Sequence, residues 1–194
     1  IRDRVKRDLP YGFAQRARAK LDLFKQRIQE YESLFDESTV FLVRTQGVGY
    51  TKAEEMVNHG VTGPNVRAAG VDYDVRWAHP YSVYSELDWA PAVERSSVKG
   101  ADCYDRYRVR ITEMVESANM VLEAIDRIPG GSETHHEPGD PAILAKAPSR
   151  APEGTFGSHH FEDSRGESMF HIVGGGDGRG KNPYRVSIRS PMFI

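Results

Sequence analysis

The sequence predicts a mainly α-helical fold with small β elements, an α+β protein in which long helices form a bundle and a β-hairpin follows near the C-terminal end. Three observations predict this fold. Two long stretches place apolar residues every three or four positions, which is typical of helices that bury one face. A late stretch alternates apolar and polar residues, as half-buried strands do. Proline and glycine separate these regions.

The first predicted helix starts near Phe13, and its apolar positions step by four and three residues as far as Phe35. Residues 1–30 hold nine basic and four acidic side chains. We assign this excess to a solvated helix face, because the overall charge is near zero, and we expect no nucleic-acid partner. After this helix, Phe41–Val43 is a short apolar run that fits a strand or a connector.

The clearest helix extends from Tyr104 to Ile128, about seven turns, and ends at Pro129. Asp102 and Asp105 stand at its start, where carboxylates cap free backbone N–H groups and complement the helix dipole. A helix of this length with a continuous apolar side needs neighbours, so we expect a helical bundle.

The C-terminal third is predicted to be a connector and a hairpin. Residues 132–164 are rich in proline, glycine, serine and histidine, the composition of an extended surface connector. Phe170–Val173 and Tyr184–Arg189 are strand candidates on either side of a glycine-rich loop. We expect these two strands to pair as an antiparallel hairpin.

The composition limits the classes of protein to which the chain can belong. The 194 residues (21.8 kDa) carry 26 Lys+Arg against 28 Asp+Glu, a net charge of −2, and 39% are hydrophobic. This is one domain or part of one. No run approaches the roughly 18 apolar residues of a membrane-spanning helix, and the start lacks the pattern of a signal peptide. We therefore expect a protein of the cytosol or of a membrane surface.

We interpret residues 1–194 as a single fragment of a larger domain. The chain starts at Ile1 within a charged segment and stops soon after a strand-like alternation. Within the fragment we expect a helical part at 1–131, a connector at 132–164 and a β-hairpin at 165–194.

No metal site is predicted from the residues of this chain. Its one cysteine, Cys103, excludes an internal disulfide and a multi-cysteine metal site. The histidine pairs 135–136 and 159–160 are adjacent residues, which cannot face one metal ion as an i, i+4 pair on a helix can. Cys103 at a helix start could act as a nucleophile, but with no histidine nearby in the sequence we interpret it as a packed residue.

Several motifs occur in an order and spacing that resemble one known family. They are Gly60–Gly70, Asp72–Arg76, Asp102–Tyr107, Arg165–Glu167 and Pro183–Pro191. Together they resemble the quinone-reducing subunit of respiratory complex I over nearly the whole chain. That family is related to the large subunit of nickel–iron hydrogenases.

The resemblance implies a long-helix bundle of the hydrogenase large-subunit type and a role in a quinone-reducing subunit. The complete enzyme would be an NADH (or equivalent donor):quinone oxidoreductase coupled to proton translocation. Quinone would be its substrate, while NADH and iron–sulfur clusters would bind to neighbouring subunits. The fragment alone would bind no cofactor and would be inactive.

The same resemblance implies partners and a location. An iron–sulfur subunit and the subunits of a membrane arm would surround the chain, which would be peripheral on the cytoplasmic side of the cell membrane. The family's best-known quinone ligands are a histidine on an N-terminal hairpin loop and a tyrosine, and both correspond to positions before Ile1. No catalytic residue is therefore assigned here.

Two alternatives stay open. The chain could be a fragment of a membrane-bound nickel–iron hydrogenase large subunit, in which the metal-binding CxxC pairs lie near the chain ends. It could also be a non-catalytic assembly module, because it carries no complete redox or acid–base constellation.

Eight charged residues at the motif positions are expected to form buried or interfacial charge networks. Glycines beside them would allow close backbone approach, so that these side chains could reach across the bundle. The network could hold helices and loops in register, or it could relay charge from the quinone site toward the pump. The eight residues are Arg67, Asp74, Arg76, Asp102, Asp105, Arg106, Arg165 and Glu167.

Overall fold

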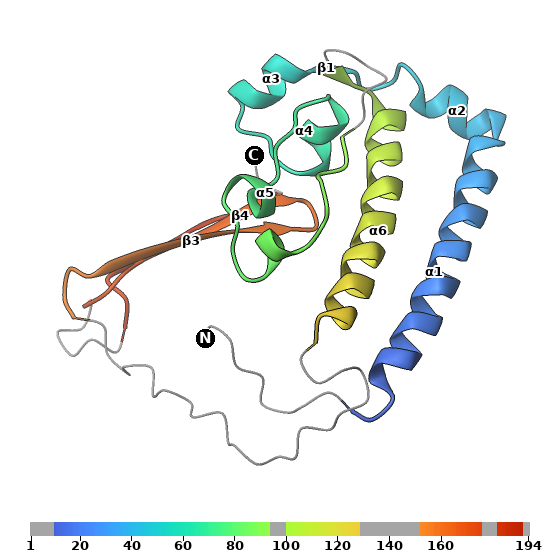
Figure 1. The fold of residues 1–194 in the computed structure, drawn as a ribbon. Helices are drawn as coiled ribbons and strands as arrows, with labels where there is room; N and C mark the ends of the chain where they lie inside the picture. Colours follow the sequence, from blue (N-terminus) through green and yellow to red (C-terminus); the bar gives the residue numbers. More distant parts are fainter. Residues whose placement is uncertain (1–9, 94–99, 129–151, 176–181, 192–194) are drawn as a thin grey trace.

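Two long antiparallel helices, α1 (Phe13–Asp36) and α6 (Cys103–Asp126), form one side of the protein (Figure 1). The computed structural model describes residues 10–93, 100–128, 152–175 and 182–191. Both long helices were predicted from their apolar periodicity. The α+β class is confirmed, because small antiparallel sheets accompany the helices.

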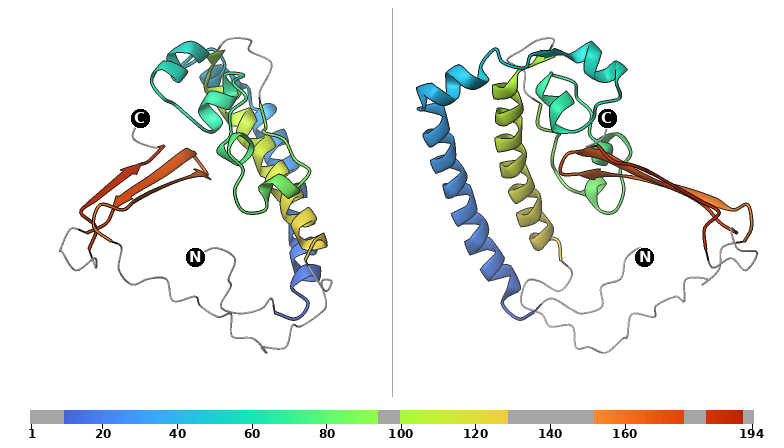
Figure 2. Two further views of the ribbon diagram at one scale, coloured as in Figure 1. Left: turned by 60° about the vertical axis from the view of Figure 1, so that its left-hand side comes forward. Right: turned by 180° about the vertical axis from the view of Figure 1, so that it is seen from behind.

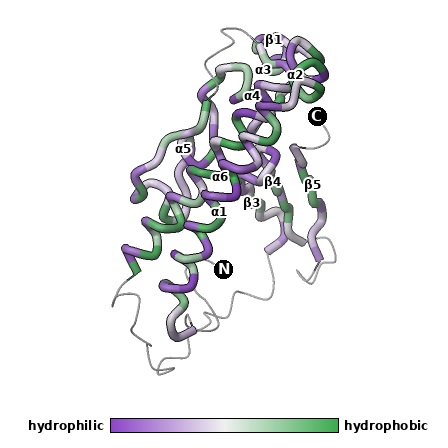
Figure 3. Tube along the Cα trace, turned by 90° about the vertical axis from the view of Figure 1, so that its right-hand side faces the viewer, coloured by the Kyte–Doolittle hydropathy of each residue, from purple (hydrophilic) through white to green (hydrophobic). Residues whose placement is uncertain are grey.

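Helices α1 and α6 pack against each other along part of their apolar stripes. Ile28 of α1 is 2% exposed, and Ala118 and Ile125 of α6 are buried as well. Coloured by hydropathy, both helices alternate apolar and polar residues along their length (Figure 3). Ion pairs link the two helices, and at one end Arg18 of α1 pairs with Asp126 of α6. The contact buries only part of the apolar stripe of α1, because Phe24, Tyr31 and Phe35 are 40–55% exposed.

The short apolar run after α1 is helical, so the expectation of a strand or connector there is wrong. Helix α2 (Thr39–Thr45) follows α1 after a break at Glu37 and Ser38. The hydroxyl oxygen of Ser38 accepts a hydrogen bond from the backbone N–H of Phe41 at 3.3 Å and caps the helix. The Phe41 ring packs on Tyr107 of α6, with centroids 5.1 Å apart. This contact with α6 favours the helical conformation over a strand that would have no partner.

Between α2 and α6 the chain forms short elements around a small core. They are β1 (Thr51–Lys52), α3 (Ala53–Asn58), α4 (Pro64–Ala68), α5 (Val75–Ala78), a 3-10 turn at Tyr84–Glu86 and β2 (Gly100–Ala101). Strand β1 pairs with β2 in an antiparallel ladder. The core beneath them contains Met56, Val66 and Val109, so α4 packs directly on α6.

A three-stranded antiparallel sheet projects from the other side of these short helices (Figure 2). Its order is β3 (Phe156–Asp163), β4 (Gly166–Val173) and β5 (Arg185–Arg189). Strands β4 and β5 pair with Phe170 opposite Ile188, which confirms the predicted hairpin.

Strand β3 corrects the expected connector at 132–164. Residues 156–163 form a strand that pairs with β4 along its whole length, whereas 132–151 lie outside the described residues. Most side chains of β3 are exposed. An exposed strand needs no alternation of apolar and polar residues, so the sequence pattern did not predict it. The division of the chain into three parts otherwise stays a prediction.

Two glycines let the sheet approach α4. Gly63 precedes α4 with φ +74°, and a Cβ atom there would lie 2.3 Å from the Cα of Gly166. Gly166 itself has φ +130°, and its Cβ would lie 2.7 Å from the Oγ1 of Thr62. Only glycine fits at both positions. This contact brings the turn between β3 and β4 against the start of α4.

None of the helices in the described segments has the length and apolar character needed to cross a bilayer.

Candidate functional site: a buried charge cluster

Arg67 is the centre of a buried ion cluster between α4, α6 and the sheet. It occupies the last turn of α4, and its side chain is 2% exposed. Its Nη2 lies 2.7 Å from Oε1 of Glu113 on α6, and its Nη1 lies 2.9 Å from Oε1 of Glu162 on β3. Asp74 completes the cluster, with its Oδ2 3.2 Å from Nη1. One guanidinium thus joins a helix, a strand and a loop.

A second arginine neutralises Asp74 from the other side. Arg76 donates from Nε and Nη2 to the two oxygens of the Asp74 carboxylate at 2.9 and 2.7 Å, a bidentate pair. The Asp74 carboxylate also accepts the backbone N–H of Arg76 and so caps α5. The Arg76 guanidinium lies over the ring of Trp89, 4.7 Å from its centroid. Asp74 is 1% exposed and fully occupied by these donors.

The cluster contains more negative than positive groups. Arg67 and Arg76 contribute two positive charges, and Asp74, Glu113 and Glu162 contribute three negative ones when ionised. Burial raises the pKa of Glu113 and of Glu162, although the charge of Arg67 opposes the rise. Both carboxyl groups therefore bind a proton more readily than exposed glutamates do.

Glu167 belongs to a second, more open cluster that Tyr73 joins to the first. The Tyr73 hydroxyl donates to Oε2 of Glu167 at 3.1 Å, while the Tyr73 carbonyl accepts from Arg67 at 3.0 Å. Burial, together with the charge of Glu167 and the hydrogen bond to it, raises the pKa of Tyr73 to about 12, so the hydroxyl keeps its proton. Burial alone would raise the pKa of Glu167, but hydrogen bonds from His160 and Tyr73 and the charge of Arg189 lower it.

Three of the predicted residues lie instead at the start of α6. Asp102 and Asp105 form a capping box, with each carboxylate accepting the backbone N–H of the other residue at 2.9 and 3.0 Å. Asp102 also accepts the N–H of Gly47 at 2.7 Å. Arg106 donates to the carbonyl oxygens of Gly49 and Ala101. The hydrogen bonds of Asp102 and Arg106 fix the start of the helix against the preceding loop and do not reach the Arg67 cluster.

Arg165 lies in the turn between β3 and β4. Its carbonyl oxygen would be 2.6 Å from a Cβ atom placed on Gly63. Its backbone is thus part of the close contact between the sheet and α4.

Sequence reasoning missed the two glutamates that surround Arg67. Glu113 follows Asp105 and the buried Val109 at four-residue spacing on α6, a signal that it faces the same side of the helix as they do. Glu162 lies in the segment expected to be a connector, so its position on β3 was not predicted. Separations of 46 and 95 residues from Arg67 leave no local pattern to detect.

The described residues do not fit an iron–sulfur or nickel–iron site. They contain no group of three or more histidine, cysteine, aspartate or glutamate side chains placed to hold a metal ion. The sequence has one cysteine, whereas such clusters are held by several thiolates. Cys103 is half-buried, with its Sγ 3.4 Å from Nη2 of Arg106. The histidine pair at 135–136 lies outside the described residues.

Comparison with known proteins places these motifs in one family. Residues 4–194 match the sequence profile described as the respiratory-chain NADH dehydrogenase 49 Kd subunit. A subunit of the NADH-quinone oxidoreductase of Flavobacterium johnsoniae is 38% identical over 199 residues, covering 90% of this chain and 46% of that protein.

Two further relatives carry other names. A subunit of the F(420)H(2) dehydrogenase of Methanosarcina mazei is 36% identical over 189 residues, covering 97% of this chain and 48% of that protein. A subunit of the NAD(P)H-quinone oxidoreductase of Gloeobacter violaceus is 34% identical over 205 residues, covering 96% of this chain and 49% of that protein. The chain spans about half the length of the curated relatives it matches.

Proposed function

The chain belongs to the family of the respiratory-chain NADH dehydrogenase 49 Kd subunit, and we propose that it forms part of the quinone-reducing subunit of a complex I-type oxidoreductase coupled to proton translocation. The observation that carries the proposal is the match to the family over residues 4–194. The relative from Flavobacterium johnsoniae, named as an NADH-quinone oxidoreductase subunit, supports the same reading.

The electron donor is NADH or an equivalent two-electron donor. The names of the three relatives refer to NADH, to NAD(P)H and to F(420)H(2). This variation in donor supports a division of labour in which other subunits oxidise the donor. Iron–sulfur clusters in those subunits would carry the electrons, since one cysteine cannot hold a cluster that needs several thiolates.

We place the chain among an iron–sulfur subunit and the subunits of a membrane arm, peripheral on the cytoplasmic side of the membrane. The family membership supports this placement.

The charged motif residues are assigned two roles. Asp102, Asp105 and Arg106 hold the start of α6, because their side chains form hydrogen bonds to backbone groups of the preceding loop and of the helix itself. The Arg67 cluster holds α4, α6 and β3 together, and the raised pKa of Glu113 and Glu162 also suits it to store a proton. A structural role and a relay role for this cluster make different predictions.

An activity test on purified assemblies checks the function. The gene in its source organism is fused to an affinity tag, and the assembly is purified from membranes and assayed for quinone-dependent oxidation of NADH, NADPH and reduced deazaflavin. We expect one of these donors to support quinone reduction, and deletion of the gene to abolish it. Hydrogen uptake by the assembly would support the hydrogenase alternative instead. Unchanged quinone reductase activity after deletion would show that the chain is not required.

Variants of the cluster distinguish the two roles. If Glu113→Gln lowers the amount of assembled complex on native gels while the remaining complex turns over normally, the cluster is structural. If assembly is normal and quinone reduction or proton pumping falls, the cluster relays charge. Glu116→Gln, on the same helix and outside the cluster, serves as the matched control.

A further inference from the structure

Three titratable side chains lie on one face of the β3–β4 ladder: His160, Glu162 and Glu167. His160 and Glu162 are two residues apart on β3, so both side chains leave the same face, and Glu162 lies directly opposite Glu167. Residues placed opposite each other in this way have Cβ atoms about 4.5–5.5 Å apart. The exposed fraction of the side chain falls from 45% for His160 to 12% for Glu167 and 4% for Glu162. The three side chains therefore form a line from the surface into the protein.

Hydrogen bonds and ion pairs connect the members of this line. The Nδ1 atom of His160 lies 2.5 Å from Oε1 of Glu167. The other oxygen of Glu167 accepts from the Tyr73 hydroxyl at 3.1 Å and lies 3.3 Å from Nη1 of Arg189. The charges of Glu167 and Glu162 both raise the pKa of Tyr73, so its hydroxyl lies near both carboxylates. Glu167 thus contacts an exposed histidine on one side and neighbours the buried Glu162 on the other.

The two glutamates differ in how readily they hold a proton. Like charges directly opposite each other destabilise a sheet, so the pair favours one bound proton. Burial raises the pKa of Glu162, although the charge of Arg67 opposes the rise. Burial would also raise the pKa of Glu167, but the hydrogen bond from His160 is among the contacts that lower it. A proton shared by the pair therefore resides on Glu162. Charged groups around Glu162 include Arg67, Asp74 and Arg76.

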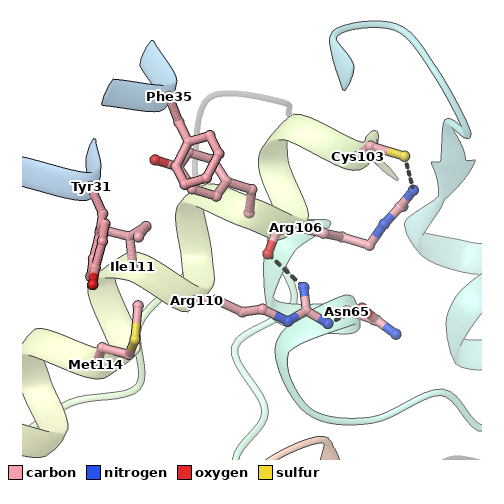
Figure 4. A pocket seen from close by; sticks show the side chains of 9 residues that line it. Tyr31, Phe35, Asn65, Cys103, Arg106, Arg110, Ile111 and Met114 are labelled. Carbon is pink, nitrogen blue, oxygen red and sulfur yellow. Dashed lines mark hydrogen bonds between the residues drawn. The ribbon is translucent and has the colours of Figure 1, made fainter. Parts of the chain in front are cut away.

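The opposite side of the buried cluster offers Glu162 no comparable source of protons among the described residues. Glu113 is 19% exposed there, but the Arg67 guanidinium bridges it to Glu162, with nitrogen–oxygen distances of 2.7 and 2.9 Å. A guanidinium has no acceptor site and stays charged, so it cannot take up a proton. Figure 4 shows the Arg110 side chain reaching toward Asn65, and its charge opposes the rise in the pKa of Glu113 that burial causes. The contacts therefore favour entry from the sheet.

We propose that His160 takes up protons from solvent for the buried Arg67 cluster and passes them through Glu167 to Glu162. One ring nitrogen of His160 binds a proton from water, and Nδ1 releases its proton to Oε1 of Glu167. The Glu167 carboxyl then gives a proton to the Glu162 carboxylate, and exchange with water restores the His160 tautomer. The net change is one proton moved from water to Glu162. The route belongs to this chain alone, and only its use in a proton-translocating enzyme rests on the proposed function.

A pH-jump experiment on the full chain tests this route. A photoacid releases protons, and time-resolved infrared spectroscopy follows the carbonyl band of protonated carboxyl groups. Glu162→Gln should remove the slow part of this band, whereas Glu113→Gln should leave it in place, and the two variants together assign it. We expect His160→Ala to slow proton uptake by Glu162 about a hundredfold, the lower end of what a positioned proton-transfer group contributes. Added imidazole should restore the rate, because it replaces the missing ring.

His171→Ala is the matched control. His171 is a histidine on the same face of the sheet, and its Nδ1 lies 2.6 Å from the hydroxyl of Ser158 rather than beside a carboxylate. Its removal should leave the rate unchanged. Glu167→Gln should slow uptake as strongly as His160→Ala, but imidazole should not restore the rate, since the carboxyl that carries the proton inward is missing. If His160→Ala does not fold by circular dichroism, His160→Gln replaces it and should show the same slow uptake.

Any of four results would overturn the proposal. Proton uptake by Glu162 could keep its rate in His160→Ala, or the rate could fall without being restored by imidazole, which would mean that His160 only supports the structure. His171→Ala could slow uptake equally. No carboxyl band that depends on Glu162 could appear between about pH 4 and pH 8. Because the assay contains no quinone, each outcome is independent of whether the complete enzyme reduces quinone.

Discussion

Arg67 and Arg110 lie on neighbouring helices and differ in how their charges are balanced. Arg67 is 2% exposed and lies within ion-pair distance of Asp74, Glu113 and Glu162. Arg110 is exposed and has an amide oxygen and a carbonyl oxygen as its described partners. The charge of Arg67 is more than matched within the chain. Arg110 forms no ion pair with a carboxylate of the described residues, although the charge of Glu113 favours its charged form.

This difference in charge balance distinguishes a buried arginine that needs ion pairs within the chain from an exposed arginine that does not. A buried charge must find its counterions during folding, because leaving it unpaired in a low-dielectric interior costs several kcal/mol. An exposed arginine can remain solvated at little cost to folding. We therefore expect Arg67 to be important for the stability of the fold and Arg110 to contribute little to it.

The largest effect is expected when Arg67 is removed. Arg67→Ala leaves Glu113 and Glu162 without their ion-pair partner, whereas Asp74 keeps Arg76. Removal of one partner of a buried ion pair typically costs about 3–5 kcal/mol. We expect the free energy of unfolding, measured by urea titration, to fall by that amount. Arg127→Ala, which breaks an exposed pair with Glu123, should change it by less than about 1 kcal/mol. Similar losses in the two variants would refute the role assigned to the Arg67 cluster.

The next effect is a pH dependence of opposite sign in the two carboxylate clusters. The pKa of Glu113 is raised from 4.5, so the folded state binds this proton more tightly than the unfolded state. Its stabilising contribution is complete below pH 4.5 and is lost as the pH rises through the folded pKa. The pKa of Glu167 is lowered from 4.5, so its contribution is present above that pH and is lost as the pH falls through the folded pKa.

Urea unfolding between about pH 3 and pH 8 measures both signs. We expect Glu113→Gln to reduce the loss of stability on the alkaline side, and Glu167→Gln to reduce the loss on the acid side. A pH profile that neither variant changes would mean that these carboxylates keep their ordinary pKa values in the folded chain.

An intermediate effect is expected at the start of α6. Asp102→Ala removes the acceptor for the N–H groups of Asp105 and Gly47, and loss of an N-cap costs about 1 kcal/mol. Thermal unfolding should show a reduced midpoint. Ser38→Ala is the matched control, because its single bond to Phe41 is 3.3 Å long and caps a shorter helix. A larger loss for Ser38→Ala would contradict the importance of the capping box.

The smallest effect completes the comparison between the two arginines. Arg110→Ala removes a charge that is paired with no described carboxylate, so the free energy of unfolding should change by less than about 0.5 kcal/mol. Low ionic strength should favour the variant, since repulsion from Arg106 is then least screened. A loss comparable to that of Arg67→Ala would show that Arg110 stabilises the fold.

The sequence by itself determined the features that depend on local spacing. Helices α1 and α6 follow from apolar residues repeated at the helical period, and the β4–β5 hairpin follows from alternation. The capping of α6 by Asp102 and Asp105 involves residues three apart, so it too could be predicted. Each of these depends on contacts within a few residues, or on one face that must be buried.

The tertiary structure decided what depends on distant partners. The helical state of α2 and the strand state of β3 depend on packing against α6 and pairing with β4, which their own sequences do not specify. The assembly of Glu113 and Glu162 around Arg67 joins residues 46 and 95 positions apart. The spacing of charged residues in the sequence does not show which distant residues will be their counterions in the folded chain. Only the folded chain therefore shows that Arg67 is balanced from within and Arg110 is not.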